Sequence, residues 1–162
     1  MKIILGLSGS LRKGSFNTAL LRAAAKRAPE GFRVEVRTLH GIPLYDGDVE
    51  AAGFPPIVSE LKDAIASADG LLLSTPEYNN GIPGVFKNAI DWLSRPPADI
   101  PRVFGGKAVA MMGASPGPAG TALSQAAWLP VLRTLGTKPW FGMKLLVSHA
   151  PHGFRPRRRA QG

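Results

Sequence analysis

"KIILGLSGSLRKGSFN", residues 2–17, joins a short apolar run to a loop rich in hydroxyl, amide and cationic groups. The apolar run at residues 2–7 is typical of a strand that is buried on both faces. Residues 16–28 then follow a helical pattern, with Leu20, Leu21 and Ala24 on one face. The chain is therefore predicted to begin with a strand, a polar loop and a helix.

The same alternation of strand and helix continues to the end of the sequence. Further strands are predicted at residues 32–39, 70–75, 107–113 and 140–147, and further helices at 56–68, 85–94 and 119–135. Five strands joined by four helical crossovers predict an α/β fold, in which helices cover both faces of a parallel sheet. In a sheet of flavodoxin-like order 2-1-3-4-5, a ligand binds beyond the carboxyl ends of strands one and three.

Length and composition favour one packed domain. The chain has 162 residues, of which 44% are hydrophobic, and a chain of this length buries roughly two thirds of its unfolded surface. There is no cysteine, which excludes disulfides and thiolate metal sites. No apolar run approaches the roughly 20 residues that a membrane span needs. We therefore expect a soluble cytoplasmic protein without a membrane partner.

The formal net charge of +9 is unevenly distributed along the chain. Residues 1–99 hold eleven Lys/Arg and eleven Asp/Glu, whereas residues 100–162 hold nine Lys/Arg and no acid. A basic segment can bind the phosphates of a nucleic acid. However, no aromatic residue that could stack on bases is interleaved with Arg155 and Arg157 to Arg159. We interpret this segment as a solvated tail and expect no nucleic-acid partner.

The polar loop has the donors that an anion requires. Ser15 occupies the predicted N-cap of the first helix, whose free N–H groups and dipole favour an anion. Ser10 and Asn17 add side-chain donors, and Arg12 adds a planar charged group. The loop matches neither a Walker motif nor the dinucleotide pattern Gly-x-Gly-x-x-Gly. The residues alone leave two interpretations open: a phosphate site, or an ordinary capped helix.

A second motif, "TPEYNNGIPGVFKNAIDWLSRP" at residues 75–96, gives this loop a family context. Together with "GSLRKGSFN", with "IPLYDGDVE" at 42–50 and with "GKAVAMMGAS" at 106–115, it closely resembles the NADPH-dependent FMN reductase family. The chromate and quinone reductase members of that family are the most similar. The resemblance covers roughly residues 3–147 and implies a flavodoxin-like fold that binds FMN.

The resemblance also implies which residues contact the cofactor. The phosphate would lie among residues of the first loop, the isoalloxazine ring would contact the second loop, and the loop after strand four would add one residue. These expected FMN contacts are Ser10, Leu11, Arg12, Ser15, Phe16, Asn17, Pro76, Glu77, Tyr78, Asn79 and Ser115. The third loop departs from the family pattern, because Ala114 replaces a hydroxyl residue and Pro116 and Pro118 replace flexible positions. No catalytic side chain and no metal ligand are assigned.

By the same resemblance, the chain would pass hydride from NADPH or NADH through FMN to quinones, chromate, azo compounds or free flavin. A homodimer or homotetramer is expected, with Tyr45, Asp46 and the predicted helix 85–94 at the subunit interface. One alternative is a flavodoxin-like electron-transfer protein that does not oxidise NAD(P)H directly. Another is a flavin-free regulator that binds nucleic acid through its basic end.

The end of the sequence departs most from the family. We expect a flavodoxin-like domain at residues 1–148 and a basic Pro/Arg-rich tail at 149–162, so that the family's terminal helix is missing. This composition leads to the hypothesis that the chain is truncated or reads out of frame near His149. Apolar side chains on one face of the sheet would then lack their cover. A family-like helix grafted after Ser148 would raise the melting temperature.

Overall fold

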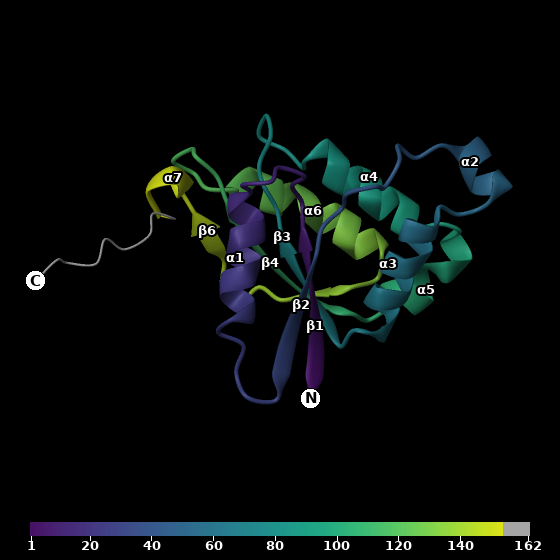
Figure 1. Cartoon of the computed structure of the whole chain (residues 1–162), viewed down its shortest axis with the longest axis horizontal. Helices are drawn as coiled ribbons and strands as arrows, with labels where there is room; N and C mark the ends of the chain where they lie inside the picture. The colour runs from purple at the N-terminus through teal and green to yellow at the C-terminus, as the bar shows by residue number, and fades with distance from the viewer. Residues whose placement is uncertain (154–162) are drawn as a thin grey trace, which may run out of the picture.

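The computed structural model describes residues 1–153 as a parallel sheet with helices on both faces (Figure 1). The strands are β1 (Lys2–Ser8), β2 (Phe32–Arg37), β3 (Gly70–Ser74), β4 (Ala108–Ala114), β5 (Lys138–Pro139) and β6 (Leu145–Val147). Their order is β2-β1-β3-β4-β5, and β6 also pairs with β4. The flavodoxin-like order predicted from the sequence is confirmed. It places β1 between β2 and β3. The connection that follows β1 and the connection that follows β2 therefore run in opposite directions across the sheet.

Helices connect the strands. They are α1 (Phe16–Ala25), α2 (Gly47–Ala52), α3 (Pro56–Ser67), α4 (Gly84–Leu93), α5 (Ile100–Val103), α6 (Ala122–Thr134), α7 (Ala150–Gly153) and the 3-10 turn η1 (Pro97–Asp99). The short helix α2 was not among the helices predicted from the sequence. It forms because Asp46 caps it, accepting a hydrogen bond of 2.8 Å from the N–H of Asp48.

The core lies between the sheet and the helices on the side opposite α1 (Figure 1). Leu5 and Leu7 of β1 and Leu71 and Leu73 of β3 point to this side, because alternate residues of a strand share a face. They pack with side chains from the helices, including Leu61, Ile65, Phe86, Ile90, Leu93, Trp128 and Leu132. The rings of Phe86 and Trp128 meet edge to face at 4.8 Å, which joins α4 to α6.

On the other face of the sheet, α1 packs against the carboxyl-terminal part of β1. Leu21 packs against Gly6 so closely that a Cβ on Gly6 would lie 2.7 Å from it. The hydroxyls of Thr18 and Ser8 are hydrogen-bonded at 2.7 Å. The close contact of α1 with β1 places the start of α1 beside the ends of the central strands.

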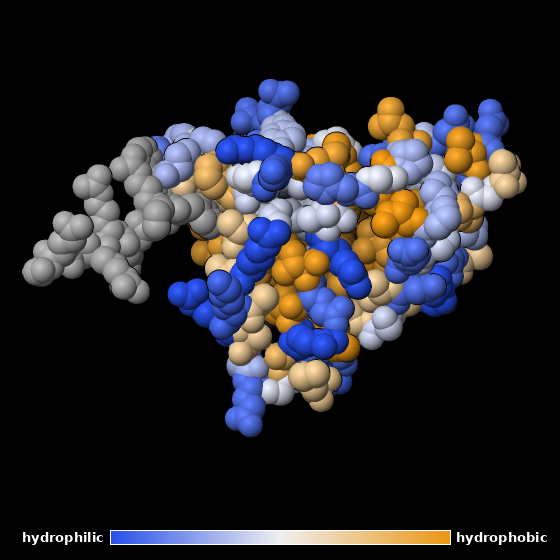
Figure 2. Space-filling view, viewed as in Figure 1, coloured by the Kyte–Doolittle hydropathy of each residue, from blue (hydrophilic) through white to orange (hydrophobic). Residues whose placement is uncertain are grey.

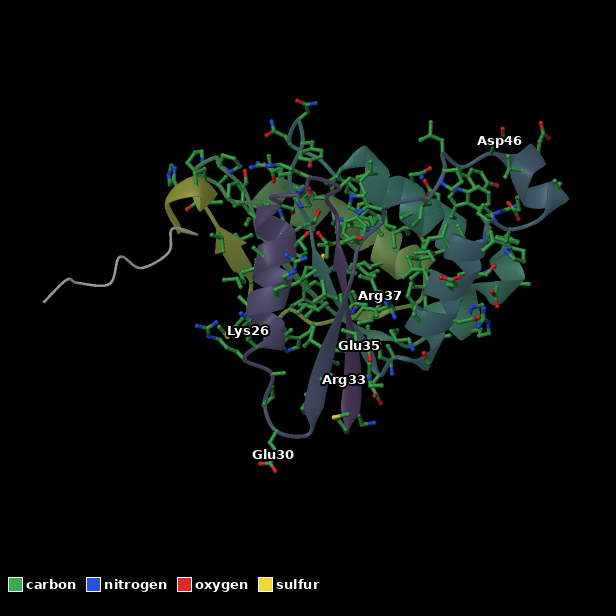
Figure 3. The ribbon with its side chains drawn as sticks, viewed as in Figure 1. Lys26, Glu30, Arg33, Glu35, Arg37 and Asp46 are labelled. Carbon is green, nitrogen blue, oxygen red and sulfur yellow. The ribbon has the colours of Figure 1, made fainter. Side chains whose placement is uncertain are left out.

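The strand β2 forms one edge of the sheet, and apolar and charged residues alternate along it. Figure 3 shows Arg33, Glu35 and Arg37 side by side along this strand, and Arg33 forms an ion pair with Glu35. Charged side chains on an edge strand oppose pairing with another sheet.

The last predicted strand, residues 140–147, is wrong as a single element. The structure instead has two short strands, β5 and β6, separated by residues 140–144. Lys138 and Trp140, on either side of Pro139, donate their N–H groups to the carbonyls of Lys107 and Val109 at 2.8 and 2.7 Å, so the ladder with β4 needs no N–H from the proline. The chain then folds so tightly at Gly142 that a Cβ there would lie 2.5 Å from the ring of Trp140. Both short strands still pair in parallel with β4.

Beyond β6, the described chain forms one helical turn, α7. Most of the predicted basic tail, residues 154–162, lies outside the described residues. Within residues 1–153, no helix is long and apolar enough to cross a membrane.

A groove of about 290 Å³ opens on the face of the sheet that α1 covers only in part. Its lining is entirely apolar or glycine and includes Ile4, Val34, Leu72, Ala110 and Trp140. Figure 2 shows hydrophobic residues gathered at the surface beside α1. Within residues 1–153, this groove leaves open part of the sheet face on which the sequence predicted apolar side chains without cover.

Candidate functional site

A pocket of about 220 Å³ lies beyond the carboxyl ends of β1, β3 and β4. Three loops build its walls, one from each of these adjacent strands. The lining residues are Ser10, Arg12, Ser15, Phe16, Asn17, Pro76, Glu77, Tyr78, Ala114, Ser115 and Pro116. The topology therefore brings together three sequence motifs that lie up to about 100 residues apart, at the position where parallel α/β sheets bind ligands.

Gly9 lets the first loop leave β1 close to the second loop. Its N–H donates to the carbonyl of Ser74 at 2.9 Å. A Cβ on Gly9 would lie 2.3 Å from the ring of Phe86 and 2.9 Å from Pro76. Only glycine fits here without a shift of these neighbours, so the close approach of the two loops depends on it.

Two serine hydroxyls of the first loop are buried and already accept one hydrogen bond each. Ser10 accepts from the N–H of Arg12 at 3.3 Å, and Ser15 accepts from the N–H of Thr18 at 3.2 Å. Ser15 is thus the N-cap of α1, as predicted. Because each hydroxyl also carries a hydrogen, both can donate to an acceptor in the pocket.

Arg12 brings a positive charge to the mouth of this pocket. Its guanidinium lies 5.2 Å from the centre of the Phe16 ring, a cation–π distance. No carboxylate of residues 1–153 forms an ion pair with it. The first turn of α1 adds N–H groups that have no acceptor within the helix. Arginine, hydroxyls and helix N-terminus together form a site suited to an anion.

The side chain of Asn17, at the start of α1, is hydrogen-bonded to the ends of β3 and β4. Its Oδ1 accepts hydrogen bonds from the N–H of Ala114 and the hydroxyl of Ser74, each at 3.0 Å, and its Nδ2 donates to the carbonyl of Ala114 at 2.9 Å. The side chain is only 3% exposed. These bonds leave Asn17 one amide hydrogen for a ligand, so its main observed contacts are structural.

The second loop is fixed to α6 by a carboxylate. Glu77 Oε2 accepts from the N–H groups of Leu123 and Ser124, both at 2.9 Å. Thr75 adds a hydroxyl contact of 2.9 Å to Ser124 and accepts from the indole of Trp128 at 3.1 Å. Glu77 therefore caps a helix from a distant loop while it lines the pocket.

A tight turn follows Glu77. Tyr78 and Gly81 exchange two backbone hydrogen bonds of 3.3 and 3.0 Å. Asn79 and Asn80 between them have φ angles of 50° and 60°, the left-handed conformation that a two-residue hairpin turn requires. Tyr78 is 49% exposed at the rim. Two expected contact residues, Asn79 and the exposed Leu11, are not part of the pocket lining.

The third loop rests on the last described residues of the chain. The N–H of Ser115 donates to Val147 at 3.0 Å, and the carbonyl of Ser115 accepts from Ala150 at 3.1 Å. The hydroxyl of Ser115 accepts from the N–H of Gly117 at 3.2 Å, and Gly117 in turn accepts from His149 at 3.2 Å. The segment from Val147 to Ala150, expected to belong partly to a tail, therefore supports a wall of the pocket.

Sequence reasoning did not assign Ala114 and Pro116 to the site, although both line the pocket. Their position directly beyond β4 is the signal that could have identified them. Among residues 1–153, no group of His, Asp or Glu is arranged to hold a metal ion.

Comparisons with known proteins identify relatives that are FMN reductases and quinone reductases. The model of the family described as NADPH-dependent FMN reductase matches residues 1–152. An NAD(P)H-dependent FMN reductase of Pseudomonas aeruginosa is 46% identical over 151 residues, which is 93% of this chain and 80% of that protein. A quinone reductase of Escherichia coli is 47% identical over 124 residues, covering 75% of this chain and 64% of the relative.

A solved structure supports the same grouping. The flavoenzyme NAD(P)H:acceptor oxidoreductase FerB of Paracoccus denitrificans superposes with a TM-score of 0.79 at 40% identity. The match covers 90% of this chain and 78% of FerB. This chain is thus shorter than the relatives that it resembles, and it spans slightly less than two thirds of the Escherichia coli relative.

Proposed function

The chain belongs to the NADPH-dependent FMN reductase family, and on this premise we propose that the pocket beyond β1, β3 and β4 binds FMN. It is an oxidoreductase of that family, which uses NAD(P)H as the electron donor. The observation that carries the proposal is the anion site: two donor hydroxyls, an arginine that forms no ion pair within residues 1–153 and a helix N-terminus share one wall of the pocket.

The donors of this wall fit a phosphomonoester. The hydroxyls of Ser10 and Ser15 would each donate one neutral hydrogen bond, and the guanidinium of Arg12 would donate charge-assisted ones. Asn17 would add one amide hydrogen while it keeps the loops in place. The dipole of α1 favours the negative charge at this position.

The second loop fits the flavin ring. A pyrimidine edge needs donors and acceptors at fixed positions, and the backbone of residues 76–79 can supply them without mobile side chains. Glu77 and the turn at Asn79 and Asn80 hold this backbone rigid. Ser115 and Pro116 would face the ring from the third loop.

When bound, FMN supplies the hydride chemistry between NAD(P)H and an acceptor such as a quinone, chromate, an azo compound or free flavin. The protein residues position the cofactor and set the charge around it. No side chain is required as a nucleophile or a general base. Tyr78 at the exposed rim would border the space that the nicotinamide and the acceptor use in turn.

We also propose a homodimer or homotetramer, assembled through α4 and through the arm, which comprises residues 42–53 and carries α2. Leu44 is 83% exposed on this arm, and Val49 is also exposed. The arm is held to α4 by hydrogen bonds from Tyr45 N–H to Asn88 at 2.8 Å and from the Trp92 indole to Pro43 at 2.9 Å. A cytoplasmic location is proposed from the sequence.

The charged groups at the base of the arm stabilise its geometry. A hydrogen bond from Arg95 lowers the pKa of Glu50, and the hydrogen bond that Tyr45 donates to Glu50 raises the pKa of the tyrosine. Both shifts favour ionised Glu50 and neutral Tyr45 near pH 7. The hydrogen bonds that Tyr45 and Arg95 donate to Glu50 thus tie the arm to the end of α4.

The proposal is tested by reconstituting the purified chain with FMN and following NADPH oxidation with menadione as acceptor. A reductase oxidises NADPH with many turnovers per flavin. A flavodoxin-like electron carrier would bind FMN but turn over poorly with free nicotinamide. Failure to bind FMN would contradict both readings.

A further inference from the structure

His40 connects the edge of the sheet to the loop that carries the anion site. It follows β2, near Thr38, and is exposed. Its Nε2 lies 2.9 Å from the carbonyl oxygen of Leu11, and its Nδ1 lies 3.1 Å from the hydroxyl of Thr38. Leu11 stands between Ser10 and Arg12, two of the proposed phosphate donors.

The two partners determine where the ring carries its proton. A carbonyl oxygen can only accept a hydrogen bond, so Nε2 of His40 must carry a hydrogen that it donates to Leu11. In the neutral ring, Nδ1 then accepts from the hydroxyl of Thr38. In the protonated ring, both nitrogens donate and the bond to Leu11 remains. The contact with the loop is therefore compatible with either charge state.

The loop has few other external attachments. The bonds from Arg12 N–H to Ser10 and from Ser15 N–H to the Arg12 carbonyl, at 3.3 and 3.0 Å, are internal. In the described chain, the bond from His40 is the one hydrogen bond that joins residues 10–14 to a segment outside this loop and α1, and residues 11–14 are exposed. Without it, the loop would depend on Gly9 and the N-cap of α1 at its two ends.

We propose that His40 is a positioning residue for the FMN phosphate. By holding the Leu11 carbonyl, it orients the hydroxyl of Ser10 and the guanidinium of Arg12 and so increases the preference for FMN over riboflavin. This inference rests on the proposed function, because it assumes that the anion in the pocket is the flavin phosphate. It assigns a role to a residue outside the pocket lining.

The test measures the dissociation constants of FMN and riboflavin by quenching of flavin fluorescence. In His40→Ala, we expect the ratio of the riboflavin constant to the FMN constant to fall about two- to tenfold, the usual worth of one hydrogen bond. The riboflavin constant itself should stay unchanged. His40→Gln, whose side-chain amide can donate to Leu11, should recover most of the ratio.

Thr38→Val is the matched control. It removes the other hydrogen bond of the same ring but keeps the Nε2 donor, so it should retain most of the preference for FMN. Melting temperatures of the flavin-free variants separate a loss of folding from a loss of positioning.

Three results would overturn the inference alone: an unchanged ratio in His40→Ala, equal losses for both flavins, or an equal drop of the ratio in Thr38→Val. If the wild-type chain does not prefer FMN to riboflavin, the proposed phosphate site fails and this inference fails with it.

Discussion

Asp99 lies between two cations, Arg102 and Lys62. Arg102 donates to its two oxygens at 2.7 and 3.0 Å, and the nearly buried Lys62 pairs with it at 2.6 Å. The hydrogen bonds from Arg102 first, and then from Lys62, hold the pKa of Asp99 far below its ordinary value. Because Lys62 belongs to α3, Asp99 to η1 and Arg102 to α5, this cluster joins the three elements. Lys62 also lies 4.7 Å from the centre of the Phe54 ring.

A pH dependence follows from the sign of this shift. Because the pKa of Asp99 is lower in the folded state than in the unfolded chain, its contribution to stability is present above the ordinary Asp pKa of about 4 and is lost as the pH falls below it. Urea unfolding at pH 6 to 3 should therefore show a steeper loss of stability in the wild type than in Asp99→Asn. Parallel pH profiles would contradict this role.

Single residues of the site were predictable where a motif has a chemical reason, and less so where packing decides. Ser10, Arg12 and Ser15, which line the pocket, could be proposed from the sequence because hydroxyls and a cation before a helix suit an anion. The three structural hydrogen bonds of Asn17 could not be read from the sequence, because its partners lie 57 and 97 residues away. His40 was missed for the same reason.

At the scale of elements, Glu77 replaces the missing local cap of α6. The N-cap residue Thr121 makes no capping hydrogen bond with its side chain, so the N–H groups of Leu123 and Ser124 depend on Glu77. Loss of a helix cap costs about 0.5–2 kcal/mol. The connection also explains why the second loop keeps its shape next to the pocket.

Glu77→Ala should lower the free energy of unfolding by about 1–2 kcal/mol, since the N–H groups of Leu123 and Ser124 lose the acceptor that caps α6. Glu77→Gln keeps an oxygen acceptor at nearly the same position and should lose less. Chemical denaturation of the flavin-free chain measures both. Equal losses for the two variants would mean that the charge, rather than the hydrogen bonds, holds the loop on α6.

The order and the type of the main elements could be predicted, because buried parallel strands and amphipathic helices have strong sequence patterns. The division of the last strand could not. It depends on the tight fold of the chain after β5, where the ring of Trp140 lies close to Gly142, and this is a matter of tertiary packing. The support of the Ser115 loop by residues 147–150 is likewise a long-range contact.

On the scale of the whole molecule, the apolar groove beside α1 continues into an exposed hydrophobic segment. Phe141 is 62% exposed and Met143 is 74% exposed, and Trp140 reaches from this segment into the groove. Exposed apolar patches of this kind mark interfaces or aggregation hazards. The positive net charge of +9 opposes self-association of the chain.

We expect the native protein to bind an environment-sensitive hydrophobic dye and to associate increasingly as salt screens its charge. Replacing Phe141 and Met143 together by lysine should weaken both effects without changing the affinity for FMN, because neither residue lines the pocket. Dye fluorescence measures the first effect, and analytical ultracentrifugation at two salt concentrations measures the association. A double variant that binds dye and associates like the wild type would show that the exposed side chains of Phe141 and Met143 are not responsible.

The central claim is that the loop at residues 9–15 and the start of α1 hold the phosphate of FMN, and the most direct test compares FMN with riboflavin in the wild type and in Arg12→Ala. One or more charge-assisted hydrogen bonds at about 1.5–3 kcal/mol predict that the variant binds FMN about 10- to 100-fold more weakly. Its affinity for riboflavin, which has no phosphate, should be nearly unchanged. Equal losses for the two ligands, or no loss for either, would contradict the phosphate assignment.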